Sequence, residues 1–280
     1  MNIAITGASG FIGRRLTDRL SAVGHTVRAI SVREEPPPEK LAGTGAVIHL
    51  AGEPVSQRWT PEVKRRIRDS RVQGTLNLIR PLSTVSERPS VLVSASAIGI
   101  YGDRGSEVLT ETSSPGNGFL AEVCREWEAQ ADLAKPLGMR VVKIRIGIVL
   151  GKSGGALAKM LPAFRYFAGG RLGSGTQWMS WVHLDDLVEL MRYAVEHPLR
   201  GVVNGTAPNP VTNREFTAEL ASALSRPAIV PVPKFALKLA FGEMGEILTQ
   251  SQRVLPRAAL ASGFHFRYPD LGPALRNLLA

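Results

Sequence analysis

The sequence has one cysteine, Cys124, and no apolar stretch of the length that a membrane-spanning helix needs. A single thiol cannot form an internal disulfide, so nothing indicates an oxidising compartment. Cys124 lies within the helical pattern EVCREWE, where we expect an inert, packed side chain. The chain begins with a strand-like segment at Asn2, which leaves no room for a signal peptide. These absences predict a cytoplasmic protein with no membrane partner.

The sequence also lacks the residue clusters of two common kinds of site. It has no Cys/His cluster with metal-ligand spacing and no Gly-x-Ser-x-Gly nucleophile elbow, so we expect no metal. Acidic residues are comparatively few, since 24 Asp and Glu stand against 34 Lys and Arg, a net charge of +10. This excess favours an anionic partner such as nucleic acid or a phosphorylated cofactor. The densest basic stretch, residues 64–71, has no interleaved aromatic residues, and we therefore predict no nucleic-acid partner.

What the sequence does contain is a regular alternation of strand and helix patterns in its first half. Alternation at this spacing predicts an α/β protein with a Rossmann-type, doubly wound parallel sheet. We expect one domain over 1–150, built on this sheet, and a substrate or cap region over 151–280. The cap region includes a small C-terminal module at about 230–280, and some of its elements return to the sheet. The predicted strands are 3–5, 27–31, 46–50, 91–94 and 140–145, and the main helices of this half are 61–82 and 118–133.

The most informative motif is TGASGFIG at residues 6–13, which follows a buried strand and opens an amphipathic helix. Gly7 permits a tight turn, Gly10 lets the backbone approach a pyrophosphate, and Gly13 allows the helix to pack closely on the strand. The helix N-terminus then offers free N–H groups and a positive dipole to the phosphates. The motif predicts a dinucleotide cofactor.

The end of the second strand indicates which dinucleotide this is. NAD-binding folds place an acidic residue there for the ribose hydroxyls, whereas a cation accommodates the 2′-phosphate of NADP. Here Ser31, Val32 and Arg33 come before the first acid, Glu34. We therefore predict NADP(H), with Ser31 and Arg33 at the 2′-phosphate. The alternative is that Arg33 is a solvated loop residue and Glu34 reaches the ribose.

Eight segments of the chain, in order, carry a resemblance to a known family. The segments are TGASGFIG, HLAGEPV, SASAIGIYGD, FLAEVCREWE, RIGIVLGKSGGALAKMLPAF, GSGTQWMSWVHLDD, GVVNGTAPNPVTNREF and RVLPRAALASGFHFRYPDL. With these segments the chain resembles the extended, nucleotide-sugar-epimerase-like short-chain dehydrogenases/reductases, and most closely their atypical branch of epimerase family proteins of unknown substrate. The resemblance covers essentially the whole chain, and its last segment resembles the small C-terminal module of this branch.

The resemblance implies a set of cofactor-binding residues, residue by residue. One departure concerns the 2′-phosphate: relatives commonly have arginine directly after the residue that corresponds to Ser31, whereas this chain has Val32 there and arginine one position later. The implied set is Gly7, Gly10, Phe11, Ile12, Gly13, Ser31, Arg33, Leu50, Ala51, Gly52, Arg71 and Arg145.

The usual catalytic pair of this superfamily is missing. No tyrosine in the chain is followed by lysine four residues later. The helix that should carry the pair has Leu120 and Cys124 at those positions or, with the alignment shifted by one residue, Phe119 and Val123. Ser96 matches the family's serine approximately. Tyr101, after the fourth strand, and Glu53, after the third, are the other groups that we consider for proton transfer.

These observations predict an NADP-dependent, epimerase-like oxidoreductase that acts on a small-molecule substrate of unknown identity. The missing tyrosine and lysine leave an alternative open, a non-catalytic NADP(H)-binding sensor or regulatory protein. The oligomeric state is also open, with a homodimer as one option.

Overall fold

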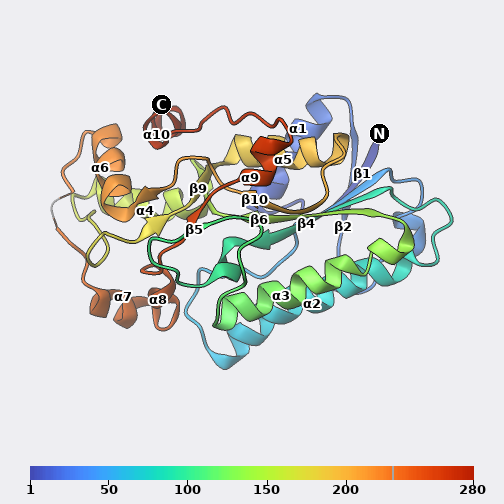
Figure 1. Cartoon of the computed structure of the whole chain (residues 1–280), viewed down its shortest axis with the longest axis horizontal. Helices are drawn as coiled ribbons and strands as arrows, with labels where there is room; N and C mark the ends of the chain where they lie inside the picture. The colour runs from blue at the N-terminus through green and yellow to red at the C-terminus, as the bar shows by residue number, and fades with distance from the viewer. Residues whose placement is uncertain (229) are drawn as a thin grey trace.

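The computed structural model describes residues 1–228 and 230–280, and its centre is a six-stranded sheet in the order β10-β6-β4-β3-β1-β2 (Figure 1). Every neighbouring pair of strands in this sheet is parallel. The predicted fold class is therefore confirmed. The strands are β1 (Asn2–Thr6), β2 (Thr26–Ile30), β3 (Ala46–His49), β4 (Val91–Ala97), β6 (Arg140–Ile146) and β10 (Gly201–Gly205).

Helices cover both faces of the sheet (Figure 1). α1 (Phe11–Ala22) and α5 (Leu184–Glu196) share a core with one face, and α2 (Pro61–Leu82) and α3 (Phe119–Asp132) cover the other. The predicted helix 61–82 has the observed bounds of α2 because Thr60 caps it, accepting a hydrogen bond from the Val63 N–H, and Pro61 suits the first turn. Within the described ranges, no helix is long and apolar enough to span a membrane.

The winding of the chain through the sheet reverses at β1, the kind of place where such sheets bind ligands. The chain passes from β1 to β2 on one side and then crosses back to β3 on the other. This crossover holds only a short 3₁₀ turn, η1 (Pro38–Lys40), in keeping with its proline-rich sequence. Ligands of such sheets bind where the winding reverses, outside the carboxyl ends of the strands. The ends of β1 and β3 therefore border the candidate binding crevice.

The chain beyond Gly151 forms smaller elements that pack around a second core. Buried apolar side chains of α4 (Gly155–Arg165), α6 (Asn213–Leu224) and α10 (Leu271–Leu279) form this core together with Trp181 of β9 (Trp181–His183), whereas β10 lies at the edge of the main sheet. The predicted capping box is present, because the Thr212 and Glu215 side chains each bond the other residue's backbone. The remaining elements are η2 (Ile98–Tyr101), β5 (Val108–Leu109), η3 (Lys135–Leu137), β7 (Ile148–Gly151), β8 (Trp178–Met179), β11 (Val211–Thr212), α7 (Lys234–Phe241), α8 (Met244–Ile247), β12 (Arg253–Val254) and α9 (Arg257–Ala261).

The start of α5 joins the C-terminal segment to the sheet. The His183 side chain caps this helix by accepting a hydrogen bond from the Asp185 N–H at 3.0 Å. The buried carboxylate of Asp186 accepts two further bonds, from the N–H groups of Arg267 and Tyr268, each at 2.9 Å. These contacts hold the chain before α10 against α5.

A buried histidine connects three of the elements that border the crevice. Thr6 Oγ1 accepts bonds from the N–H groups of Leu50 and Ala51, so its own proton is donated to Nδ1 of His49, 2.6 Å away. Nε2–H of His49 then donates to Thr75 Oγ1 on α2 at 3.0 Å. This chain of bonds requires a neutral imidazole that is protonated on Nε2.

We predict that the stability of the protein depends on pH through His49. Burial, with a smaller effect from the Arg71 guanidinium, lowers the pKa of His49 from 6.5 to about 4. Between these two pH values the unfolded chain binds more protons than the folded one, so stability is complete above pH 6.5 and is lost as pH falls toward 4. The loss from this group is about 3 kcal/mol.

Urea unfolding of the wild type and His49→Asn at several pH values measures this loss. Asparagine can still accept the Thr6 proton but does not titrate. The variant should therefore be less stable at neutral pH and should show a flatter pH dependence between 6.5 and 4. Parallel pH profiles for the two proteins would contradict the assignment.

Candidate functional site

The glycine turn between β1 and α1 leaves no room for side chains. Gly7 has φ +71°, and a Cβ on Gly7 would lie 2.9 Å from the Ala51 nitrogen. A Cβ on Gly13 would lie 2.1 Å from the Gly7 carbonyl oxygen. The Gly10 N–H closes the turn by donating to that same oxygen at 3.0 Å. Both outer glycines are therefore required by the packing of the turn itself.

The N-terminus of α1 faces the crevice without a side-chain cap. Gly10 is its N-cap residue and has no side chain to bond the first N–H groups. The aromatic ring of Phe11 turns away, toward a turn where a Cβ on Gly151 or Gly154 would lie 2.5 Å from it. Ile12 packs against the core of the sheet. What these two residues offer a phosphate is therefore their backbone N–H groups, which fits a pyrophosphate at a helix N-terminus.

The segment after β2 presents alternate side chains to the solvent. Val32 is 6% exposed and packs against Gly74 of α2, while Asn77 donates to the Val32 carbonyl oxygen at 3.0 Å. Ser31 and Arg33 are exposed on the other side, and Ser31 Oγ accepts a bond from the Arg33 N–H at 3.4 Å. Among the residues that the structure describes, none pairs with the Arg33 guanidinium. Both polar side chains are thus available to an anion at this corner.

The segment after β3 is packed against a half-buried arginine. A Cβ on Gly52 would lie 3.1 Å from the guanidinium carbon of Arg71, which explains the glycine. This guanidinium lies 5.1 Å from the Trp127 ring and donates to the Glu53 carbonyl oxygen at 3.0 Å. Burial lowers the pKa of Arg71, and no carboxylate within the described ranges forms an ion pair with it. A cation without a counter-ion beside the crevice suits an anionic ligand.

A row of buried polar side chains crosses the carboxyl ends of three strands. Ser96 on β4, Arg145 on β6 and Asn204 on β10 are direct neighbours in the strand register. Glu128 of α3 lies over this row and forms a two-pronged ion pair with Arg145, at 2.7 and 3.0 Å. It also accepts a hydrogen bond from the Ser96 hydroxyl at 2.7 Å. Burial alone would lower the pKa of Arg145, but the hydrogen bonds to Glu128 raise it above its ordinary value.

Tyr101 belongs to the same network and is completely buried. Its hydroxyl accepts a bond from Arg145 at 3.0 Å and lies 2.7 Å from Asn204 Oδ1. Burial raises the pKa of Tyr101, although the Arg145 charge opposes this effect. The structure therefore brings together Ser96, Tyr101 and Arg145, three residues singled out from the sequence. It places the Arg145 guanidinium in an ion pair, and its contact with a cofactor stays a prediction.

Glu53, the third catalytic candidate, lies outside this network. Its carboxylate oxygen accepts a bond from the Gln57 amide at 3.1 Å and lies 3.8 Å from Nε of Arg66. Its backbone N–H is held by the Ser70 hydroxyl at 2.9 Å. Glu53 is thus positioned by α2 and the segment after β3, at the border of the crevice.

The positions of the missing tyrosine and lysine contain no group that transfers a proton at neutral pH. Leu120 packs against Gly99, where a Cβ would lie 3.3 Å from the leucine side chain. Cys124 is 3% exposed, and burial raises the pKa of its thiol to about 11. The described residues also contain no His, Cys, Asp or Glu group suited to a metal ion.

Sequence reasoning missed Glu128 and Asn204 as members of the buried network. A signal for this network was present, because polar residues alternate with apolar ones in the fully buried strands VLVSASA and RVVKIRI. Side chains at alternate positions share one face of a sheet. Ser96 and Arg145 therefore had to face the same covering helix, which is α3.

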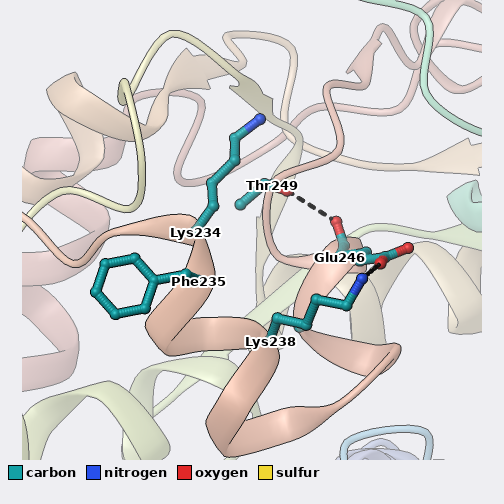
Figure 2. A pocket seen from close by; sticks show the side chains of 6 residues that line it. Lys234, Phe235, Lys238, Glu246 and Thr249 are labelled. Carbon is teal, nitrogen blue, oxygen red and sulfur yellow. Dashed lines mark hydrogen bonds and ion pairs between the residues drawn. The ribbon is translucent and has the colours of Figure 1, made fainter.

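A shallow hollow of about 290 Å³ lies on the surface of the C-terminal module, between α7 and α8 (Figure 2). Phe235 of α7 lines it and is 74% exposed, while Lys238 turns toward Glu246 at 3.1 Å. The lining comes from the helices of this module, whereas the candidate crevice is formed by the strand ends.

Comparisons with known proteins agree with this geometry. The pattern of the NAD dependent epimerase/dehydratase family matches residues 3–207, and that of a domain of unknown function (DUF1731) matches residues 232–278. The chloroplastic epimerase family protein SDR39U1 homolog of Arabidopsis thaliana is 46% identical over 302 residues, which cover 100% of this chain and 87% of that protein. The epimerase family protein YfhF of Bacillus subtilis is 38% identical over 299 residues, with coverages of 100% and 98%. The crystal structure of human SDR39U1 (isoform 2) with NADPH has a TM-score of 0.91 and 33% identity, with coverages of 100% and 99%.

We predict that Glu128 is essential to the fold at this edge of the sheet. Glu128→Gln leaves the buried Arg145 charge without its counter-ion and should lower the free energy of unfolding by about 3–5 kcal/mol. As a control, Glu35→Gln removes the same charge from an exposed ion pair with Arg80 and should change stability little. Chemical unfolding of both variants measures the difference, and equal small losses would show that the Glu128 pair contributes nothing beyond a surface ion pair.

Proposed function

Because the chain belongs to the NAD dependent epimerase/dehydratase family, we propose that it binds NADP(H) in the crevice and acts as an epimerase-like oxidoreductase on a small-molecule substrate. The observation that carries the proposal is the uncapped N-terminus of α1, which Gly7 and Gly13 pack closely against the carboxyl ends of β1 and β3. The human relative whose structure is known was crystallised with NADPH. When bound, the reduced nicotinamide supplies a hydride.

In this proposal, different residues of the chain bind different parts of the cofactor. The N–H groups at the start of α1 hold the pyrophosphate, and Ser31 and Arg33 bind the 2′-phosphate of the adenosine half. The segment of Leu50, Ala51 and Gly52 passes along that half. Arg71 adds a positive charge beneath Gly52, where an anionic cofactor would relieve its lack of an ion pair. Arg145 remains a member of the proposed site, beside the row of polar side chains.

The proton that accompanies the hydride must move through groups other than a tyrosine and lysine pair. Ser96 is suited to this, because its hydroxyl is hydrogen-bonded to the Glu128 carboxylate and lies at the carboxyl end of β4. Glu53, at the end of β3, is the second candidate. Tyr101 is buried like Ser96, and its hydroxyl is held by Arg145 and Asn204, so we propose a positioning role for it through Arg145.

A second candidate function is supported by one observation. Leu120 and the neutral thiol of Cys124 occupy the positions of the usual catalytic pair. A protein that binds NADP(H) without turnover, as a sensor or regulator, needs no such pair. Consumption of NADPH with a panel of carbonyl compounds separates the two functions, since a sensor would bind the cofactor and oxidise none of it.

The charges of α2 favour a small anionic ligand over a nucleic acid. Three cations of the basic stretch are paired with carboxylates, as Lys64 with Glu243, Arg66 with Glu62 and Arg68 with Glu126. Such pairs reduce the field that a polyanion would experience. We propose a small-molecule partner and a cytoplasmic location for the protein.

The first prediction from this proposal concerns cofactor choice. The protein should bind NADPH more tightly than NADH, and Arg33→Ala should weaken NADPH binding by about ten- to a hundredfold while leaving NADH unchanged. Arg80→Ala removes a surface cation from the same region and serves as the control. Fluorescence titration of both cofactors decides the matter. Equal affinities for the two cofactors would contradict the proposal, and an unaffected Arg33→Ala variant would shift the role to Arg71.

The second prediction concerns proton transfer. Once a carbonyl compound that the protein reduces has been identified, Ser96→Ala and Glu53→Gln should each lower kcat for it by a factor of roughly 10²–10⁴. Tyr101→Phe should keep much of the rate, because we assign the phenol a positioning role and not the proton transfer. NADPH consumption measures all three. A collapse of activity in Tyr101→Phe, with its folded structure intact, would identify this tyrosine as the acid.

A further inference from the structure

Several cations of the cap region surround the glycine-rich loop before β8. A Cβ on Gly175 would lie 3.3 Å from the side chains of both Arg171 and Arg214, and one on Gly173 would lie 3.2 Å from that of Lys234. Figure 2 shows Lys234 extending away from α7, whereas Lys238 turns toward its carboxylate partner. Within residues 1–228 and 230–280, none of the three cations around the loop has an ion-pair partner. This part of the cap is strongly basic and is not neutralised by the chain itself.

A fourth cation, Arg253 of β12, is stacked on an aromatic ring. Its guanidinium carbon lies 4.2 Å from the centroid of Trp178, which follows the same loop. The Nε atom of Arg253 is buried and has no hydrogen-bond partner among the described residues, and no carboxylate there pairs with the group. A half-buried guanidinium with an unmet donor is costly unless something else supplies the acceptor.

The Arg253–Trp178 pair is held next to the end of β4. The side chain of Gln252, the residue before Arg253, donates to the carbonyl oxygens of Ile98 and Gly102 at 3.2 and 3.0 Å. The Trp178 N–H donates to the Ser251 hydroxyl at 2.9 Å. Ile98 directly follows β4, so the pair stands close to the strand end that carries the proposed proton-transfer group.

We propose that Arg253, stacked on Trp178, binds an anionic group of the substrate, either a carboxylate or a phosphate. This inference rests on the proposed function, because it takes the crevice at the end of β4 as the place where substrate binds. Stacking fixes the plane of the guanidinium, and its two terminal nitrogens, which form no hydrogen bond among the described residues, can make two parallel bonds to an oxyanion. Of the three cations around the loop, Arg171 donates to the Ser174 carbonyl oxygen at 2.7 Å, whereas Arg214 and Lys234 are exposed, so they add to the positive charge of this region but are not part of the proposed contact.

Anion titrations of the NADP⁺-saturated protein test this proposal, because saturation blocks the phosphate sites of the cofactor. Inorganic phosphate and malonate are added at constant ionic strength, with sodium chloride as the reference, and tryptophan fluorescence reports binding. The wild type should bind at least one of the two anions saturably, and the tighter one identifies the group. Arg253→Gln should bind it at least tenfold more weakly, and Arg253→Lys should retain part of the affinity.

Arg226→Gln is the matched control, since Arg226 also lies over an aromatic ring, that of Phe167 at 5.0 Å, but is exposed. It should bind the anions as the wild type does, and all variants should keep the wild-type affinity for NADPH, which also shows that they are folded. No saturable binding to the wild type, or equal affinities in Arg253→Gln and the wild type, would overturn the proposal. Failure of the wild type to bind NADPH would instead contradict the proposed function, and the titration of the cofactor-free protein would still decide the role of Arg253.

Discussion

The ion pair between Glu128 and Arg145 is the contact on which the rest of the site depends. Both side chains are buried, and removing two charges from water is repaid only when every remaining donor and acceptor is satisfied. The surrounding residues meet this demand: Ser96 donates to the carboxylate, and Tyr101 accepts from the guanidinium. Because the participants come from β4, β6, η2 and α3, the pair holds the carboxyl ends of the strands in one arrangement beneath the crevice.

Arg145 differs from two other arginines of the molecule in having a carboxylate partner. Arg145 has its counter-ion within the chain and therefore stabilises the fold. Arg71 and Arg253 are likewise removed from full contact with water and packed on tryptophan rings, but within the described ranges neither has a carboxylate partner. Retaining such charges lowers stability unless a ligand neutralises them. In the function that we propose, these two unpaired arginines would bind the anionic parts of the cofactor and the substrate.

Local sequence signals predicted most of the fold, because they depend on residues close together in the chain. The glycine turn, the helix at 61–82 and the capping box of Thr212 and Glu215 are of this kind. The fourth strand was expected to end at Ser94 but continues to Ala97, because it stays paired with β6 as far as Ala97 and the Ser96 hydroxyl donates to Glu128 of the distant helix α3. The partner of Arg145 could not be predicted for the same reason, because it depends on how α3 lies across three strands. The resemblance to a family singled out Arg145 but did not predict its ion pair with Glu128.

The alternation of side chains after β2 explains the departure at the 2′-phosphate corner. Val32 points into the core against Gly74, and the Asn77 amide bonds its carbonyl oxygen, so the direction of this residue is determined by α2. An arginine placed directly after Ser31 would then point into the apolar core in this backbone, at the cost of burying its charge. A cation can reach the same exposed side as Ser31 only from the next alternate position, which is that of Arg33. The shift by one residue is therefore what the packing of Val32 requires if Ser31 and Arg33 bind one phosphate together, as we propose.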